Sequence, residues 1–147
     1  MIKNILVICI GNICRSPMGE ALFKNQLINS QPNLQVHSAG LQAMVGYPAD
    51  PFSQELMQLK GLDISSHRAQ QATPELLFNA ELILTMCSNQ QVQIEKNYPG
   101  TRGRVHRLGK WEGFDIPDPY KRPRIVFEQT LALIEQGIND WYRKLWN

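Results

Sequence analysis

The chain has 147 residues, and we expect a single domain spanning residues 1–147 that buries enough apolar surface to fold alone. Its 15 lysines and arginines nearly balance its 13 aspartates and glutamates, which argues against nucleic-acid binding driven by overall charge. No apolar run reaches the ~20 residues that cross a bilayer, so membrane insertion is not expected, and the first residues lack the features of a signal peptide.

Cysteine and histidine usage bears on redox state and on metals. Three cysteines, an odd number, favour free thiols in a reducing cytoplasm over a disulfide framework. The histidines and cysteines are too few and too badly spaced for a structural zinc site. We therefore expect no metal and no cofactor.

The predicted elements alternate between strands and helices. In chain order they are a strand at residues 3–9, a helix at 17–29, a strand at 34–38, a helix at 51–60, a short helix beginning at 73–75, a strand at 81–86, a helix at 88–98, a strand at 105–108 and a C-terminal helix. Ser16 and Ser88 are the expected N-caps of the helices that follow them, and Pro17 is the expected first residue of its helix, where a missing N–H does no harm. Gly61 suits the position just beyond a helix end.

The C-terminal helix carries one apolar face. Its apolar residues recur every three or four positions, at Phe127, Leu131, Ile134, Ile138, Trp141 and Leu145. A cofactor or a partner could use such a face, but packing against a core is the favoured interpretation. The order of elements predicts an α/β fold of the flavodoxin- or Rossmann-like kind, with a central four-stranded parallel sheet and helices on both faces. Ligands in such folds bind beyond the carboxyl ends of the strands, where Cys9 lies.

The segment after the first strand predicts a site for a phosphate-like anion. Cys9 ends the strand, Arg15 follows six positions later, and a helix opens directly afterwards. The Cys-x5-Arg spacing alone is weak evidence, because short motifs recur by chance. The context is more specific, since successive backbone amides can point inward and the helix adds its positive N-terminal end. The residues that would supply these contacts are Ile10, Gly11, Asn12, Ile13, Cys14 and Ser16.

Within this loop, residue types favour both binding and nucleophilic chemistry. Gly11 and Asn12 tolerate a positive φ most readily, so the loop can curl there. Arg15 offers a planar fork to two phosphoryl oxygens and keeps its charge. The same positive field is expected to favour the thiolate form of Cys9, to which Ser16 is placed to donate a hydrogen bond. The alternative is an unreactive buried strand cysteine, which would leave the other loop residues without a shared purpose.

Cleavage of a phosphate ester also calls for an acid, because an aryl oxygen needs a proton as it departs. We expect that acid on a loop over the site, and residues 115–120 form a proline-stiffened loop between the last strand and the last helix. Asp118, flanked by two prolines, is the candidate, but on spacing alone Asp115 is nearly as good. Either could also be a turn aspartate with no chemical role, since turns favour Asp.

These motifs resemble those of the low-molecular-weight protein tyrosine phosphatases, particularly their bacterial branch. The resemblance runs nearly end to end and rests on residues 9–17, 38–40, 83–86 and 118–120. It implies the family's fold and metal-independent hydrolysis of phosphotyrosine through a cysteinyl-phosphate intermediate. It also implies that Cys9 is the nucleophile, Arg15 the clamp on the phosphate and the transition state, and Asp118, rather than Asp115, the general acid and later the base.

The same resemblance assigns supporting roles. Asn12, Ser38 and His67 resemble members of a hydrogen-bond network that braces the loop. Met44 and Tyr120 resemble the two walls that grip the substrate ring, although the family often has an aromatic residue at the Met44 position. Substrate preference is therefore open.

Two further positions also stay open. Cys14 resembles a cysteine that can form a reversible disulfide with the nucleophile and protect it from over-oxidation, with a packed small apolar residue as the alternative. Gln70 stands where the family often has arginine, and its consequence is not evident from the sequence.

Two other functions compete with the phosphatase. Thioredoxin-coupled arsenate reductases share this fold and loop, and Cys87 lies where they carry a second redox cysteine, but Val92 and Ile94 stand where a third would be required. A non-catalytic phosphate- or phosphotyrosine-binding module would need neither a thiolate nor an acid. By resemblance to bacterial members, the expected partner is a phosphotyrosine protein, such as a tyrosine autokinase of polysaccharide export, which implies a part in exopolysaccharide regulation.

Overall fold

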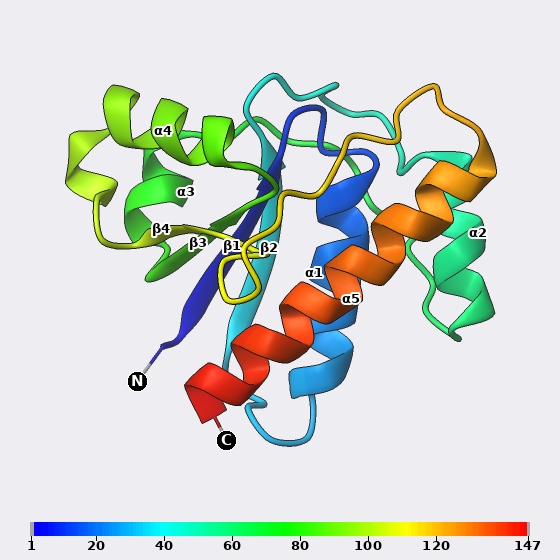
Figure 1. The fold of residues 1–147 in the computed structure, drawn as a ribbon, viewed down its shortest axis with the longest axis horizontal. Helices are drawn as coiled ribbons and strands as arrows, with labels where there is room; N and C mark the ends of the chain where they lie inside the picture. Colours follow the sequence, from blue (N-terminus) through cyan, green and yellow to red (C-terminus); the bar gives the residue numbers. More distant parts are fainter. Residues whose placement is uncertain (1, 147) are drawn as a thin grey trace.

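A four-stranded parallel sheet lies between two layers of helices in the computed structural model, which describes residues 2–146 (Figure 1). In chain order the elements are β1 (Asn4–Cys9), α1 (Arg15–Leu27), β2 (Gln35–Gly40), α2 (Pro51–Leu59), α3 (Pro74–Asn79), β3 (Leu82–Thr85), α4 (Ser88–Asn97), the 3-10 turn η1 (Pro99–Thr101), β4 (Val105–Arg107) and α5 (Arg124–Trp146). The strand order is β2-β1-β3-β4. The α/β fold expected from the sequence is confirmed.

The strand register brings three loops to one edge of the sheet. Cys9 at the end of β1 pairs with Gly40 at the end of β2, and Val7 pairs with Leu84 of β3 on the other side. The carboxyl ends of these strands therefore meet at the edge that lies at the top of Figure 1. Ligands of parallel sheets bind at this edge.

Alternate residues of β1 face the two helix layers, since side chains of a strand point to opposite faces. Ile5 and Val7 pack into the core that α1, α2 and α5 cover, where Phe127 of the C-terminal helix is also buried. Leu6 and Ile8 pack into the core beneath α3 and α4. Because both faces of β1 are covered, its sequence is an unbroken apolar run, and Cys9 is held at the end of a rigid, buried strand.

Two predicted N-caps are wrong. Ser16 is the second residue of α1 and Ser88 is the first residue of α4, so neither stands at the N-cap. Pro17 is the third residue of α1 and not the first, because the helix begins at Arg15. The Ser16 hydroxyl is hydrogen-bonded within the preceding loop instead. The Ser88 backbone N–H is bound by the Asp115 carboxylate.

The remaining element predictions lie within a few residues of the observed bounds. Gly61 has a φ of 76° and follows the C-cap of α2, as predicted. The predicted apolar face of α5 is buried except for Leu145, which is partly buried. Among residues 2–146, no helix has the length and the apolar character needed to cross a membrane.

Candidate active site

Cys9 lies at the end of β1 with its thiol under the loop that follows. Its Sγ is 2.9 Å from Ser16 Oγ, and the backbone N–H of Asn12 donates to it at 3.2 Å. The side chain is buried, and α1 begins a few residues later, so that the positive end of the helix dipole is close by. Two hydrogen-bonding groups of the loop therefore reach the sulfur, which packing of an unreactive core cysteine does not require.

Asn12 holds the curl of this loop. Its φ of 59° is the left-handed conformation that the sequence predicts for this region, whereas Gly11 does not share it. The Asn12 side chain donates from Nδ2 to Ser16 Oγ at 2.7 Å and to Ser38 Oγ at 3.0 Å. His67 Nε2 lies 2.8 Å from the Asn12 carbonyl oxygen. The structure thus brings Asn12, Ser38 and His67 together.

Gln70 ties a distant segment to this network. Its backbone N–H donates to Asn12 Oδ1 at 2.9 Å, and its side-chain amide donates to the Ser38 carbonyl at 3.0 Å. These bonds give a structural part to a position whose consequence was open from the sequence. With Oδ1 and both Nδ2 hydrogens bonded, the Asn12 amide has a single orientation.

Arg15 is buried and joins the loop to the segment before α5. Its Nη1 donates to the Ile116 carbonyl at 2.9 Å, and its Nη2 lies 3.7 Å from Asp118 Oδ2. The Arg15 Nε is buried, with no hydrogen-bond partner among the described residues. A buried, unpaired donor is costly unless a ligand meets it, so the guanidinium is prepared for an anion.

The side chains around Cys9 enclose a pocket of about 220 Å³. It is lined by Cys9, Ile10, Gly11, Ile13, Cys14, Arg15, Gln42, Met44, Asp118 and Tyr120. Met44 and Tyr120, the two walls expected from the resemblance, both line it. Ser38 and His67 are not among these lining residues, and each is hydrogen-bonded to Asn12 of the loop.

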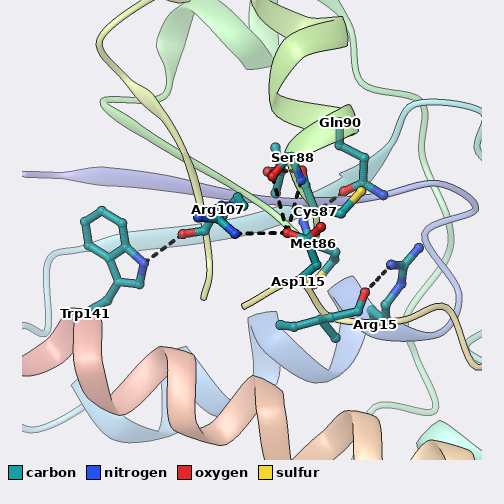
Figure 2. Close-up of polar contacts among 10 residues, drawn as sticks. Arg15, Met86, Cys87, Ser88, Gln90, Arg107, Asp115 and Trp141 are labelled. Atoms are coloured by element: carbon teal, nitrogen blue, oxygen red, sulfur yellow. Dashed lines mark hydrogen bonds and ion pairs between the residues drawn. The ribbon is translucent and has the colours of Figure 1, made fainter. Parts of the chain in front are cut away.

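The two aspartates of the 115–120 loop point to different places. Asp118 lines the pocket, and its Oδ1 accepts a hydrogen bond from the Tyr120 backbone at 3.1 Å. Asp115 instead accepts from Ser88 and from Arg107, whose Nη1 lies 3.1 Å from Asp115 Oδ1 (Figure 2). The geometry therefore separates two candidates that spacing alone left nearly equal.

The three cysteines are free and lie in different surroundings. Cys14 is buried beside the pocket, and its burial raises the pKa of its thiol, as do the negative charges of Asp50 and Cys9. Cys87 is half-buried at the N-cap of α4, on the neighbouring strand's end. Cys14 is thus the cysteine that lies in the loop directly after Cys9.

Three contributions to the site were missed in the sequence. Glu20 accepts a hydrogen bond from Ser38 Oγ, and Gln42 both lines the pocket and donates its backbone N–H to the Ile10 carbonyl at 3.0 Å. The Ile116 carbonyl accepts a hydrogen bond from Arg15. The sequence spacing could have indicated Glu20, because it stands four residues after Ser16 and therefore on the same face of α1. Backbone contributions carry no such signal.

Comparison with known proteins gives one consistent result. The sequence model described as "Low molecular weight phosphotyrosine protein phosphatase" matches residues 4–147. The chain is 49% identical over 145 residues to the probable low molecular weight protein-tyrosine-phosphatase EpsP of Ralstonia solanacearum, covering 99% of this chain and 97% of that protein.

Solved structures agree with this result. The fold is similar to the crystal structure of the Erwinia amylovora tyrosine phosphatase AmsI, with a TM-score of 0.93, 37% identity and coverage of 100% of this chain and 95% of that one. It is also similar to Vibrio vulnificus Wzb in complex with benzylphosphonate, with a TM-score of 0.91, 35% identity and coverage of 99% and 100%.

Proposed function

The chain belongs to the low molecular weight phosphotyrosine protein phosphatases, and we propose that it hydrolyses phosphotyrosine esters through a cysteinyl-phosphate intermediate on Cys9. One observation carries the mechanism. Ser16 Oγ and the Asn12 N–H both reach Cys9 Sγ in a pocket that also contains Arg15 and Asp118. A nucleophile, an anion clamp and a proton donor therefore face one small volume.

In the first step Cys9 Sγ attacks phosphorus, and the bond between phosphorus and the aryl oxygen breaks. Asp118, in its protonated form, gives its proton to that oxygen, because a phenolate with a pKa near ~10 is a poor leaving group at neutral pH. The products are a phenol, a cysteinyl phosphate and an Asp118 carboxylate. The Asp118 side chain is 46% exposed, so it can exchange its proton with solvent.

In the second step water attacks the phosphocysteine. The Asp118 carboxylate takes a proton from that water, the sulfur–phosphorus bond breaks, and Cys9 leaves as a thiolate with inorganic phosphate as the product. The hydrogen bonds from Ser16 and Asn12 stabilise the sulfur as its charge returns. After the two steps Cys9 is again a thiolate and Asp118 again carries its proton.

The charge of the transferring group is matched by the protein's own groups. Arg15 lines the pocket with a fixed positive charge and an Nε that has no hydrogen-bond partner among the described residues, and the loop amides and the N-terminus of α1 add partial positive charge. These donors can stabilise the negative charge of the transition state, which a metal ion stabilises in other phosphoryl-transfer sites. We therefore propose that activity needs no metal ion and no other cofactor.

Pocket shape supports preference for aryl phosphates. Tyr120 and Met44 both line the pocket, and an aromatic ring and a thioether are side chains that pack well against a phenyl ring. The structure of the related Vibrio vulnificus Wzb in complex with benzylphosphonate, an aryl-containing phosphate analogue, supports the same preference.

The physiological partner proposed is a tyrosine-phosphorylated protein. Bacterial relatives such as EpsP and Wzb are named protein-tyrosine-phosphatases. Through the resemblance to that bacterial branch we propose a tyrosine autokinase of polysaccharide export as the substrate. The three free cysteines favour a reducing compartment such as the cytoplasm.

The test is turnover of p-nitrophenyl phosphate and of a phosphotyrosine peptide by the wild type, Cys9→Ser and Asp118→Asn. Cys9→Ser should abolish turnover yet still bind phosphate, and Asp118→Asn should slow phenolic substrates by ~10²–10⁴-fold. Excess chelator should leave the wild type active. Full activity of Cys9→Ser, or dependence on a divalent cation, would refute the mechanism.

Arsenate serves as the control for the reductase alternative. If the chain reduced arsenate, thiols would be oxidised in an arsenate-dependent manner and the reaction would be lost in Cys87→Ser. We expect no such oxidation, because positions 92 and 94, where a third redox cysteine would be required, hold valine and isoleucine.

A further inference from the structure

We propose that Asp115 is a positioning residue that anchors the 115–120 loop and so aims Asp118 into the pocket. The inference rests on the proposed function, in which Asp118 is the general acid. Asp115 Oδ1 accepts from the Ser88 backbone N–H at 3.2 Å, from Ser88 Oγ at 3.4 Å and from Arg107 Nη1 at 3.1 Å. Figure 2 shows Ser88 and Arg107 meeting at Asp115, apart from Arg15.

The first anchor uses the N-terminus of α4. Within residues 2–146 the N-cap residue Cys87 makes no side-chain capping hydrogen bond, so the first N–H groups of this ten-residue helix need another acceptor. Asp115 supplies it from the 115–120 loop, and a carboxylate at this end is favoured by the helix dipole. The helix cap and the loop anchor are thus the same interaction.

The second anchor is Arg107, the last residue of β4. Its guanidinium binds Asp115, and its carbonyl accepts a hydrogen bond from Trp141 Nε1 of α5 at 3.2 Å. Trp141 is itself buried in the core. Asp115 is therefore tied to the sheet, to α4 and, through Arg107, to α5.

The residues between Asp115 and Asp118 are also held in place. The Ile116 N–H donates to the Met86 carbonyl at 2.8 Å, and the Ile116 carbonyl accepts from Arg15. Only two residues, Ile116 and Pro117, lie between Asp115 and Asp118, so at most about 11 Å of chain joins their backbones. Prolines stand on both sides of Asp118 and restrict its backbone, so a shift at Asp115 changes the direction of the acid.

Removing the Asp115 side chain should lower the catalytic rate more than the free energy of unfolding. The Asp115 side chain is 50% exposed, and exposed ion pairs contribute little to folding. Misplacing a catalytic group by ~1 Å can instead cost up to ~10²-fold in rate. We therefore expect Asp115 to affect the catalytic rate, through the position of the 115–120 loop, more than the free energy of unfolding.

The experiment compares two aryl phosphates that differ in their need for an acid. Phenyl phosphate needs a proton on its leaving oxygen, whereas 2,4-dinitrophenyl phosphate releases a stable phenolate. Asp115→Ala should lower kcat/KM about tenfold for phenyl phosphate and less than about twofold for the dinitrophenyl ester. Asp115→Asn keeps an oxygen acceptor for the Ser88 N–H and should recover most of the loss. Glu112→Ala, an exposed acid nearby in sequence, should behave as wild type.

Combination with Asp118→Asn separates this inference from the function on which it rests. If Asp115 acts through Asp118, then adding Asp115→Ala to Asp118→Asn should leave kcat/KM for phenyl phosphate unchanged. An equal loss on both substrates, or an additive loss in the double variant, would overturn the positioning role. If Asp118→Asn itself has no effect on phenyl phosphate, the proposed acid is wrong.

Thermal melting shows whether each variant is folded. Should Asp115→Ala fail to fold, Arg107→Gln removes one of the donors to Asp115 and has to show the same selective loss on phenyl phosphate. If Arg107→Gln changed kcat/KM by the same factor for phenyl phosphate and for 2,4-dinitrophenyl phosphate, or changed neither, the proposal would be wrong.

Discussion

The hydroxyl of Ser38 donates a hydrogen bond to Glu20 Oε1 across 2.5 Å, and this bond orients the network behind Cys9. Because its one hydrogen is used by Glu20, Ser38 Oγ accepts from Asn12 Nδ2. The other Nδ2 hydrogen goes to Ser16 Oγ, which leaves the Ser16 hydrogen free to point at Cys9 Sγ. A carboxylate four hydrogen bonds from the sulfur thus selects the orientation that stabilises a thiolate.

Replacing Glu20 should therefore weaken catalysis without touching the pocket. Hydrogen bonds to charged groups contribute ~1.5–3 kcal/mol, so partial loss of the Ser16 donation in Glu20→Ala should lower kcat/KM for p-nitrophenyl phosphate about tenfold. Glu20→Gln keeps an acceptor for Ser38 and should lose less than about threefold. Lys24→Ala is the control, since it removes only the 2.6 Å ion pair to Glu20. A loss in Lys24→Ala as large as in Glu20→Ala would contradict the relay.

Gly40 should not tolerate a methyl group. A Cβ at this position would lie 2.4 Å from the Ile10 carbonyl oxygen and 3.1 Å from the Ala43 Cα. Both are backbone atoms, so the loop after β1 would have to shift. Gly40→Ala should cost ~1–3 kcal/mol of unfolding free energy and at least about tenfold in kcat, measured by urea unfolding and p-nitrophenyl phosphate turnover.

Gly100→Ala is the matched control for that substitution. Its Cβ would meet the Phe78 ring at 3.1 Å, a side chain that is half-exposed and can move aside. We expect a cost below ~1 kcal/mol and unchanged kcat. Equal behaviour of the two alanine variants would show that the Ile10 carbonyl is not a constraint.

The fold could be predicted from the sequence, and so could the loop that carries the candidate reacting groups, because their signals are local. The period of the apolar residues gave the helices and strands, and the Cys9 loop with its flanking helix gave an anion site. Asp118 is set apart from Asp115 in the sequence by its two flanking prolines, but which of the two carboxylates lines the pocket depends on the three-dimensional structure. Spacing left the two nearly equal, and the family resemblance rather than the residues alone favoured Asp118.

The misassigned N-caps have the same cause. A serine before a helix is a reasonable cap by propensity, but Ser16 is used by Asn12 and Cys9, and the Ser88 N–H is used by Asp115 from 27 positions away. Tertiary hydrogen bonds replaced the local ones at both helix ends. The two serines for which N-cap propensity gave a wrong prediction are thus residues that bond to the loop of Cys9 and to the loop of Asp115.

Acidification should destabilise the fold through His106. Burial lowers the pKa of His106, and the positive charge of Lys110 lowers it further, while Glu95 opposes the shift. The unfolded chain, with an ordinary histidine pKa near ~6.5, then binds more protons than the native state as the pH falls. The stabilising contribution is present above pH ~6.5 and is lost as the pH falls through the lowered pKa.

His106→Gln should remove this contribution to the pH dependence. Urea midpoints at about pH 7.5 and about pH 5 should differ less in the variant than in the wild type. Lys110→Gln, which removes the second cause of the shift, should give an intermediate difference. A wild-type midpoint gap that persists in full in His106→Gln would assign the acid sensitivity to other groups.

Oxidation should be reversible only while Cys14 is present. Burial raises the pKa of the Cys14 thiol, so at neutral pH hydrogen peroxide should react with Cys9, giving a sulfenic acid and water. Condensation of that sulfenic acid with the Cys14 thiol would release a second water and leave a disulfide that dithiothreitol reduces. In Cys14→Ser a second molecule of peroxide can oxidise the Cys9 sulfenic acid to a sulfinic acid and release water, so this variant should lose activity irreversibly, whereas the wild type should recover at least about half of its activity. Cys87→Ser, which changes the cysteine outside the loop, should recover like the wild type, and recovery of Cys14→Ser to the same extent would leave Cys14 as a packing residue only.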